Sequence, residues 1–112
     1  MREIKFRARW VDTLEVVDDF EYEYLISAIS DDNFIVEQYT GLKDKNGIEI
    51  YEGDIVKLAD LNYKVFWDEW KWNASCPYYH QHHYPQFGDR FYSNARCSEV
   101  IGNIHENGDL LK

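Results

Sequence analysis

Apolar and polar residues alternate along several short segments of the chain, which predicts β-strands. In residues 4–10 the apolar side chains at the even positions alternate with the basic side chains of Lys5, Arg7 and Arg9. A period of two places the apolar set on the core face of a strand and the basic set on its solvent face. Residues 20–24 alternate aromatic with acidic side chains in the same way, and the residues that follow them also suit a helical turn.

The middle and the end of the chain divide into strands and turns. β-Branched and aromatic residues favour strands at residues 34–39, 48–50, 55–58, 63–67, 70–72 and 99–104. Turns rich in Asp, Asn and Gly are predicted at residues 44–47, 51–54 and 60–62. Short strands with turn signals at intervals of roughly 8–12 residues indicate an antiparallel sheet that curls into a small barrel or sandwich.

We therefore expect one mainly β domain over residues 1–112, with an α+β arrangement as the alternative for its N-terminal part. Residues 39–112 are expected to form a small, partly open antiparallel β-barrel, and residues 1–38 a β element packed on it. A length of 112 residues with 45% hydrophobic and 17% aromatic residues supports a core of its own. Residues 73–96 show no strand pattern, and so long a connection is usually functional or partly disordered.

The chain is acidic, with a formal net charge of −9. Nine carboxylates and no Lys or Arg lie between Asp12 and Glu37. Because nucleic-acid affinity depends on Lys and Arg contacts to phosphate, this composition makes nucleic acid a poor candidate partner. No signal peptide and no apolar run of about 20 residues is visible, so we expect a cytoplasmic protein without a membrane span. In that compartment Cys76 and Cys97 are expected to be reduced thiols.

Three blocks of sequence carry a family resemblance. They are MREIKFRA at residues 1–8, QYTGLKDKNGIEIYEGDIV at 38–56, and EVIGNIHEN at 99–107, which is followed by two leucines. In this order they resemble the YopX family of phage and prophage proteins. The resemblance implies a small β-rich protein of a phage or prophage in a bacterial cytoplasm, and it supplies no catalytic residues because the family is uncharacterised.

One position departs from the family pattern. The family has Trp directly after the Ala, whereas Arg9 separates Ala8 from Trp10 here. One inserted residue would turn Trp10 to the other face of the strand unless a β-bulge absorbs it.

Cysteine and histidine residues in the second half of the chain are candidate zinc ligands. They are Cys76, His80, His82, His83 and Cys97. The spacing argues against a site, because structural zinc ligands come in close pairs and each cysteine stands alone. No nucleophile motif surrounds either cysteine and no phosphate-binding glycine motif is present. We therefore predict no metal, no cofactor, no catalytic residues and no enzymatic activity.

A dense run of aromatic residues extends from Trp67 to Tyr92. Part of it must be core, since consecutive residues of one strand point to opposite faces. We predict an interaction surface in this run because Trp and Tyr are enriched at binding hot spots. Its predicted residues are Trp70, Trp72, Tyr78 and Tyr79. Plain packing in the core is the alternative.

Three functions follow from these observations. The leading hypothesis is a non-catalytic phage or prophage accessory protein that binds another protein or assembles with itself. The first alternative is single-stranded nucleic-acid binding by an aromatic face together with the basic strand of Lys5, Arg7 and Arg9. The second is an acidic mimic, in which residues 12–37 occupy a host nucleic-acid-binding protein. A solvated acidic face explains that block without a partner.

Overall fold

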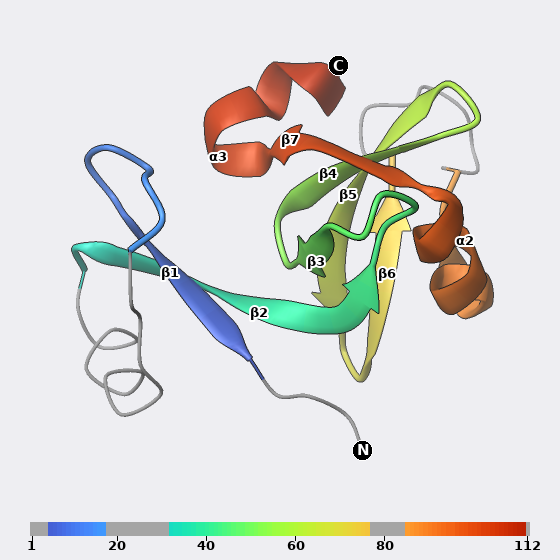
Figure 1. Cartoon of the computed structure of the whole chain (residues 1–112), viewed down its shortest axis with the longest axis horizontal. Coiled ribbons are helices and arrows are strands. Elements are labelled where there is room, and N and C mark those ends of the chain that lie inside the picture. Colours follow the sequence, from blue (N-terminus) through green and yellow to red (C-terminus); the bar gives the residue numbers. More distant parts are fainter. Residues whose placement is uncertain (1–4, 18–31, 77–84, 112) are drawn as a thin grey trace.

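The computed structural model describes residues 5–17, 32–76 and 85–111, whose strands form two antiparallel sheets (Figure 1). The first sheet has the order β1-β2-β3, with strands Phe6–Trp10, Phe34–Lys43 and Glu49–Tyr51. The second has the order β6-β5-β4-β7, in which β4 to β7 are Asp54–Leu58, Leu61–Asp68, Lys71–Ser75 and Glu99–Asn103. The prediction of a mainly β chain is confirmed.

The two sheets meet at a sharp crossing between β3 and β4. β3 pairs with β2, and the chain then turns at Gly53 into β4 of the other sheet. Gly53 has a φ of +86°, and a Cβ added there would lie 2.9 Å from Oε2 of Glu37, so this crossing requires glycine. The detail of a partly open barrel over residues 39–112 is wrong, because the strands of this segment belong to two sheets. Its boundary at residue 38 falls inside β2, which joins the N-terminal strand to β3.

Turn chemistry sets the ends of the central strands. Oδ1 of Asp44 accepts two backbone N–H groups of its turn at 2.8 and 2.9 Å, and Gly47 has a φ of +82°. This confirms the turn predicted at residues 44–47. The turn predicted at residues 60–62 lies earlier in the structure. Ala59 and Asp60 form a two-residue hairpin turn, with φ values of 50° and 67°. β5 therefore begins at Leu61, inside the segment predicted as a turn.

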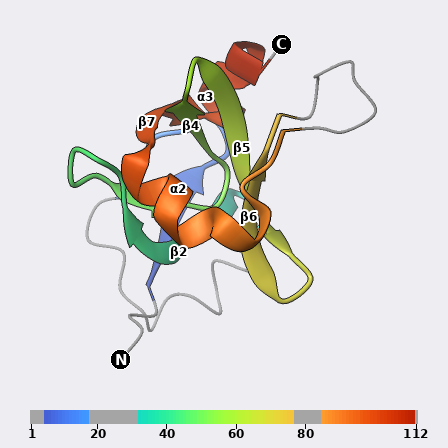
Figure 2. The ribbon, with the colours of Figure 1, turned by 90° about the vertical axis from the view of Figure 1, so that its right-hand side faces the viewer.

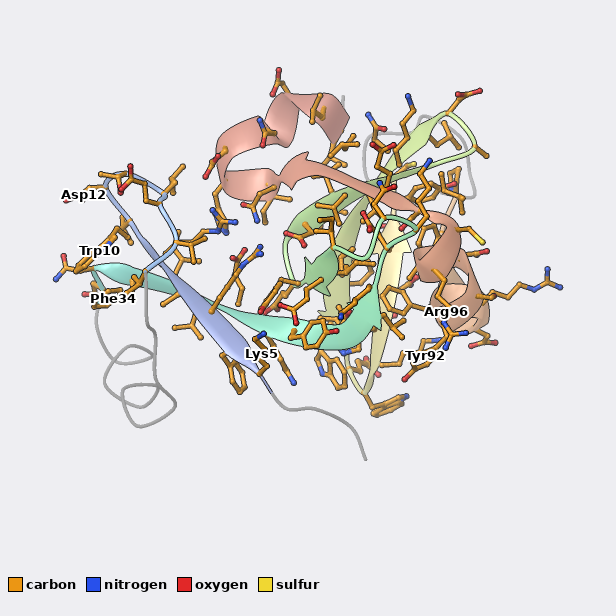
Figure 3. The ribbon with its side chains drawn as sticks, in the orientation of Figure 1. Lys5, Trp10, Asp12, Phe34, Tyr92 and Arg96 are labelled. Carbon is orange, nitrogen blue, oxygen red and sulfur yellow. The ribbon has the colours of Figure 1, made fainter. Side chains whose placement is uncertain are left out.

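The hairpin of β1 and β2 runs without interruption past Arg9. The pairs extend in continuous register from Phe6–Gln38 to Trp10–Phe34, so no bulge follows the additional residue. The rings of Trp10 and Phe34 contact each other with centroids 4.5 Å apart at the far end of the hairpin (Figure 3).

Helices occupy much of the stretch in which no pattern was found. η2 spans Gly88–Arg90 and α2 spans Phe91–Cys97, so residues 73–96 are not one long connection. Helix α2 lies beside the second sheet (Figure 2), and its buried residues Phe91 and Ala95 belong to the hydrophobic core. The buried members of this core are Ile50, Val56, Tyr63, Val65, Trp72, Ala74, Cys76, Phe87, Phe91 and Ala95.

Two short helices follow β7. They are α3 at Ile104–Asn107 and η3 at Gly108–Leu111. Oδ1 of Asn103 begins α3 by accepting the backbone N–H of His105 at 2.9 Å. No helix in the described ranges is long and apolar enough to cross a membrane.

Candidate functional site

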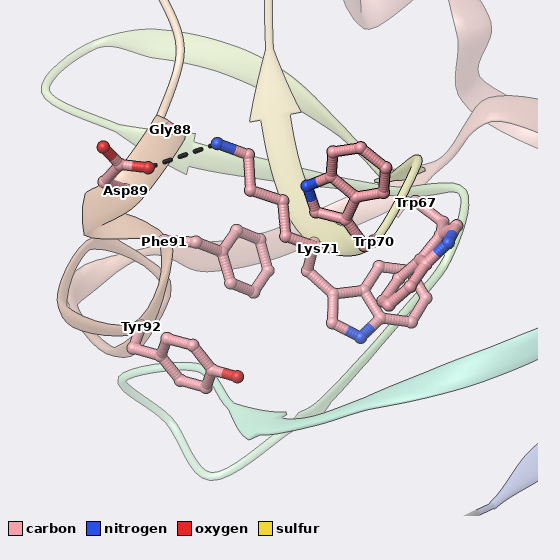
Figure 4. Close-up of a pocket in the computed structure, with 8 residues that line it drawn as sticks. Trp67, Trp70, Lys71, Gly88, Asp89, Phe91 and Tyr92 are labelled. Atoms are coloured by element: carbon pink, nitrogen blue, oxygen red, sulfur yellow. Dashed lines mark hydrogen bonds and ion pairs between the residues drawn. The ribbon is translucent and has the colours of Figure 1, made fainter.

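Three exposed aromatic side chains gather where the β5–β6 hairpin meets α2 (Figure 4). They surround a hollow of about 180 Å³, which we call the aromatic groove. Its lining residues are Trp67, Trp70, Lys71, Trp72, Gly88, Asp89, Phe91 and Tyr92.

The hairpin turn presents one wall of the aromatic groove. β5 and β6 are joined by the two-residue loop of Glu69 and Trp70, and Glu69 takes a φ of 56°. This tight loop leaves the side chain of Trp70 79% exposed. Nε1 of Trp67 donates to the carbonyl of Glu69 at 2.7 Å, and its ring meets Trp72 edge to face with centroids 5.1 Å apart. Strand pairing therefore holds Trp67 and Trp72 in this wall, whereas Trp70 projects from the tight loop.

Helix α2 and the segment before it form the other wall. Phe91 is buried, and the ring of Tyr92 lies edge-on to it with centroids 6.1 Å apart. Nζ of Lys71 reaches across the groove to Oδ1 of Asp89 at 3.2 Å (Figure 4). Both charged groups are well exposed to solvent, so this ion pair holds the walls together only weakly. The groove offers ring faces for contact.

The predicted interaction surface is only partly where we expected it. Trp70 is exposed in the hairpin loop, just before β6, and not in the strand predicted at residues 70–72. Trp72 is only 5% exposed and belongs to the core. Its pairing with Trp67 puts both rings on the face of the sheet that carries the core, and there Trp72 packs in one cluster with Phe87 and Phe91. Tyr78 and Tyr79 lie outside the described residues. The role of this surface in binding stays a prediction.

Two groove residues were not assigned to the surface from the sequence. Trp67 follows Phe66 in a strand whose buried positions are Tyr63 and Val65, and Tyr92 follows the buried Phe91. Alternation assigns Trp67 to the same face as Tyr63 and Val65, so its 42% exposure depends on how far the core covers the end of that face. For Tyr92, two neighbouring aromatics do not by themselves show which one is exposed.

Apart from the aromatic groove, a cluster of polar side chains is buried beneath strands β1 and β2. Nε of Arg7 donates to Oε1 of Glu37 at 2.7 Å, and Nη2 of Arg7 donates to Oδ1 of Asp54 at 2.7 Å. Nε of Arg9 donates to the same Glu37 oxygen at 2.8 Å. We call Arg7, Arg9, Glu37, Asp54 and Asn103 the buried ion cluster.

The predicted solvent-facing basic strand is therefore wrong. Arg7 and Arg9 point into the protein because Glu37 and Asp54 neutralise them there. Nζ of Lys5 pairs with Glu49 at 3.0 Å. This arrangement takes away the basic face on which the nucleic-acid alternative depended.

The C-terminal segment closes the buried ion cluster. Nδ2 of Asn103 donates to Oε2 of Glu37 at 3.0 Å, and Nε2 of His105 lies 3.7 Å from the same oxygen. Nη1 of Arg9 donates to Oε1 of Glu106 at 3.0 Å. Hydrogen bonds thus join strand β1 to helix α3.

The charges in this cluster shift each other's titration. Burial alone would lower the pKa of Arg7, but the charges of Asp54 and Glu37 outweigh it and raise that pKa. Burial alone would raise the pKa of Glu37, but its hydrogen bonds to Arg7, Asn103 and Arg9 lower it. For Asp54 burial prevails, and its pKa is raised despite the nearby Arg7. The cluster is thus a structural salt bridge in which one carboxylate is well compensated and the other less so.

The candidate metal ligands are mostly outside the part of the chain that the structure describes. Cys76 is buried, its Sγ donates to the carbonyl of Asn62 at 3.0 Å, and burial raises its pKa. Cys97 is exposed. His80, His82 and His83 are not among the described residues, so the absence of a metal site stays a prediction.

The acidic block of residues 12–37 also lies only partly within the described residues. Glu37 at its end belongs to the buried ion cluster, whereas residues 18–31 lie outside the described ranges. The acidic-mimic alternative also stays a prediction.

Comparison with known proteins places the fold. Residues 4–112 match the model of the family described as YopX protein. The crystal structure of protein EF1440 from Enterococcus faecalis is similar over 100% of both chains, with a TM-score of 0.64 and 22% sequence identity. At that identity the likeness shows a shared fold alone. Comparison with curated proteins gives no match. Since the family model matches nearly the whole sequence, the chain belongs to the YopX family.

Proposed function

We propose that this YopX-family protein is a non-catalytic phage or prophage accessory protein that binds another protein through the aromatic groove. The observation that carries the proposal is the side chain of Trp70, which is 79% exposed on a tight hairpin loop. An exposed Trp beside further exposed rings is typical of a binding hot spot, because it buries a large apolar area at little cost in side-chain entropy.

The charges around the aromatic groove favour a protein over a nucleic acid. Stacked bases need basic side chains beside the rings to hold the phosphates. Lys71, the cation in the groove lining, is paired with Asp89. Arg7 and Arg9 are engaged in the buried ion cluster. The net charge of −9 adds a general repulsion of phosphate.

The same charge favours a foreign partner over a second copy. Two copies each carrying a net charge of −9 repel each other, most strongly at low ionic strength. We therefore propose a monomer in dilute solution whose groove receives a side chain of a different protein.

The experiment compares wild type with Trp70→Ala and with Trp10→Ala as the matched control. Trp10 is also exposed, at 44%, but lies on the other hairpin. Each protein is first measured by light scattering over a concentration series and is then used for affinity capture from the bacterial host. We expect monomers, and a host protein that wild type and Trp10→Ala retain and Trp70→Ala loses.

Two outcomes contradict the proposal. One is a captured protein that Trp70→Ala retains as well as wild type does. The other is a stable oligomer in light scattering that Trp70→Ala dissociates, because the occupant would then be a second copy. Far-UV circular dichroism confirms that the variants are folded.

A further inference from the structure

One edge of β2 is only half covered by neighbouring strands. β1 pairs with β2 along one edge, from Phe34 to Gln38. On the other edge β3 pairs with β2 only between Tyr39 and Lys43, and the chain then turns away at Gly53 (Figure 1). The N-terminal half of that second edge therefore has no strand partner among the described residues.

The register fixes which backbone groups face the uncovered edge. The N–H of Tyr39 donates to the carbonyl of Lys5 at 2.8 Å, and the N–H of Val11 donates to the carbonyl of Asn33 at 2.9 Å. Hydrogen-bonded and non-hydrogen-bonded pairs alternate in an antiparallel ladder. The odd-numbered residues from 33 to 39 thus direct their N–H and C=O groups toward β1, and the even-numbered residues of β2 in this range direct theirs away from it.

Val36 is the centre of the uncovered edge. The carbonyl of Gln38 already accepts the N–H of Glu52 at 2.9 Å, so that position is satisfied. For the backbone N–H and C=O of Val36, the described part of the chain offers no hydrogen-bond partner. An uncovered strand edge of this kind is a template for another strand.

A groove of about 340 Å³ runs along this same edge. It is bounded by β2, the β3–β4 crossing, β5 and the start of α3. Its lining residues are Ile35, Val36, Glu37, Glu52, Gly53, Lys64, Val65, Phe66, Ile104 and His105. Two contacts hold lining residues of this groove in place. The N–H of Ile104 donates to the carbonyl of Gly53 at 2.9 Å, and Glu37 is held in the buried ion cluster. It shares no lining residue with the aromatic groove.

We propose that this groove binds an extended segment of a partner protein, which adds a strand to the uncovered edge of β2. An extended backbone supplies the alternating N–H and C=O groups that Val36 lacks, which a helix cannot do because its own backbone groups are already paired. Successive side chains of a strand point to opposite faces, so every second residue of the segment contacts the apolar lining at Phe66 and Ile104. The segment is therefore expected to carry apolar residues at alternate positions.

The test uses a defined peptide, acetyl-Lys-Val-Lys-Val-Lys-Val-Lys-amide, at an ionic strength of about 0.15 M to screen general charge attraction. Its apolar residues alternate, and its charge suits an acidic protein. Two control peptides carry N-methyl groups on the Val or on the Lys residues, which blocks one backbone edge or the other. The readout is hydrogen exchange of individual amides by nuclear magnetic resonance.

We expect the peptide to protect the Val36 amide, by about a hundredfold when the peptide concentration is 100 times its Kd. One methylation pattern should abolish the protection and the other should leave it. Val36→Pro removes the N–H that faces the groove but no hydrogen bond to β1, so it should fold and lose the peptide, whereas Val36→Thr should retain it. If Val36→Pro does not fold, the two methylated peptides still decide the question.

Three results overturn the proposal. The first is the absence of protection at Val36 under saturating peptide. The second is equal binding of both methylated peptides, which would mean attraction by charge alone. The third is a dimer in light scattering that Val36→Pro dissociates, because the edge would then serve a second copy. None of these results bears on the aromatic groove, which is tested by Trp70→Ala.

Discussion

Glu37→Gln tests whether the buried ion cluster holds the two sheets together. Glu37 is 2% exposed and accepts hydrogen bonds from Arg7 and Arg9 at one oxygen and from Asn103 at the other. Glutamine keeps the shape but replaces one oxygen by an NH₂ group. Whichever way the amide turns, a donor then faces a donor, and two guanidinium groups lose their shared counter-charge.

The expected loss is large compared with the stability of a small domain. Removing one partner of a buried ion pair costs about 3–5 kcal/mol, because the charge left behind is desolvated and uncompensated. Domains of this size unfold with a free energy of about 5–15 kcal/mol, so the variant should lose a substantial part of it. The matched control is Glu99→Gln. The Lys45–Glu99 pair is 3.7 Å long and half exposed, so its loss should cost at most about 1 kcal/mol.

The assay is urea unfolding followed by tryptophan fluorescence and far-UV circular dichroism, with linear extrapolation of the free energy to water. Coincident transitions from the two probes justify a two-state analysis. A loss in Glu37→Gln no larger than that in Glu99→Gln would refute the reasoning, since the cluster would then contribute no more than a surface pair does.

The pH dependence of the same variant checks the sign of the effect. The pKa of Glu37 is lowered from its ordinary 4.5 in the folded state, so this carboxylate stabilises the fold above 4.5 and the contribution is lost as the pH falls through the lowered value. The raised pKa of Asp54 acts oppositely: its contribution is present below its ordinary 3.8 and is lost as the pH rises. Wild type should therefore lose more unfolding free energy on acidification than Glu37→Gln does. An equal loss in both proteins would contradict this assignment.

Three further changes test the core, the crossing and the thiols. Trp72→Ala should cost about 3–5 kcal/mol in urea unfolding because it empties the core below the aromatic groove; a cost below 1 kcal/mol would contradict its burial. Gly53→Ala should destabilise more than Gly47→Ala, since both force a positive φ but only the first brings a Cβ to 2.9 Å from a carboxylate oxygen. In the folded protein, a thiol reagent should modify the exposed Cys97 well before Cys76, whose pKa is raised by burial; equal rates would contradict the packing around Cys76.

Local chemistry made the strands and several turns predictable from the sequence. An Asp that caps its own turn and a Gly three residues later identify residues 44–47 without knowledge of the rest of the chain. The strands around the β5–β6 hairpin were predictable from their β-branched and aromatic residues, but its loop of Glu69 and Trp70 carries no such turn signal. The seven residues of α2 make about two turns, which is too short for a helical period to show.

The direction in which β1 faces was not predictable, because it depends on distant partners. Alternation separates a strand into two faces, and a charged face usually meets solvent. Here Arg7 finds its carboxylates 30 and 47 residues along the chain, at Glu37 and Asp54. Glu37 is also the last residue of the acidic block at residues 12–37, which the sequence alone would place on a solvated face. Only the crossing of the two sheets brings these charges together.

The candidate site shows the same division between local and distant information. The abundance of aromatic residues drew attention to Trp70, whose exposure follows from its place in a two-residue loop. Trp72 shares a sheet face with Trp67, and it is buried because Phe87 and Phe91, distant along the chain, pack in the same cluster. The uncovered edge at Val36 was invisible, since it results from where β3 leaves β2.

The buried ion cluster explains why this edge stays accessible. Replacing a buried ion pair by packed apolar side chains is often neutral or stabilising, so stability alone does not account for this cluster. Glu37 receives donors from β1 and from the end of β7, so it sets the position of the β1–β2 hairpin relative to the second sheet. The same residue lines the groove beside Val36. The cluster thus fixes the position of β2, and with it the edge at Val36, relative to the second sheet on the other side of the groove.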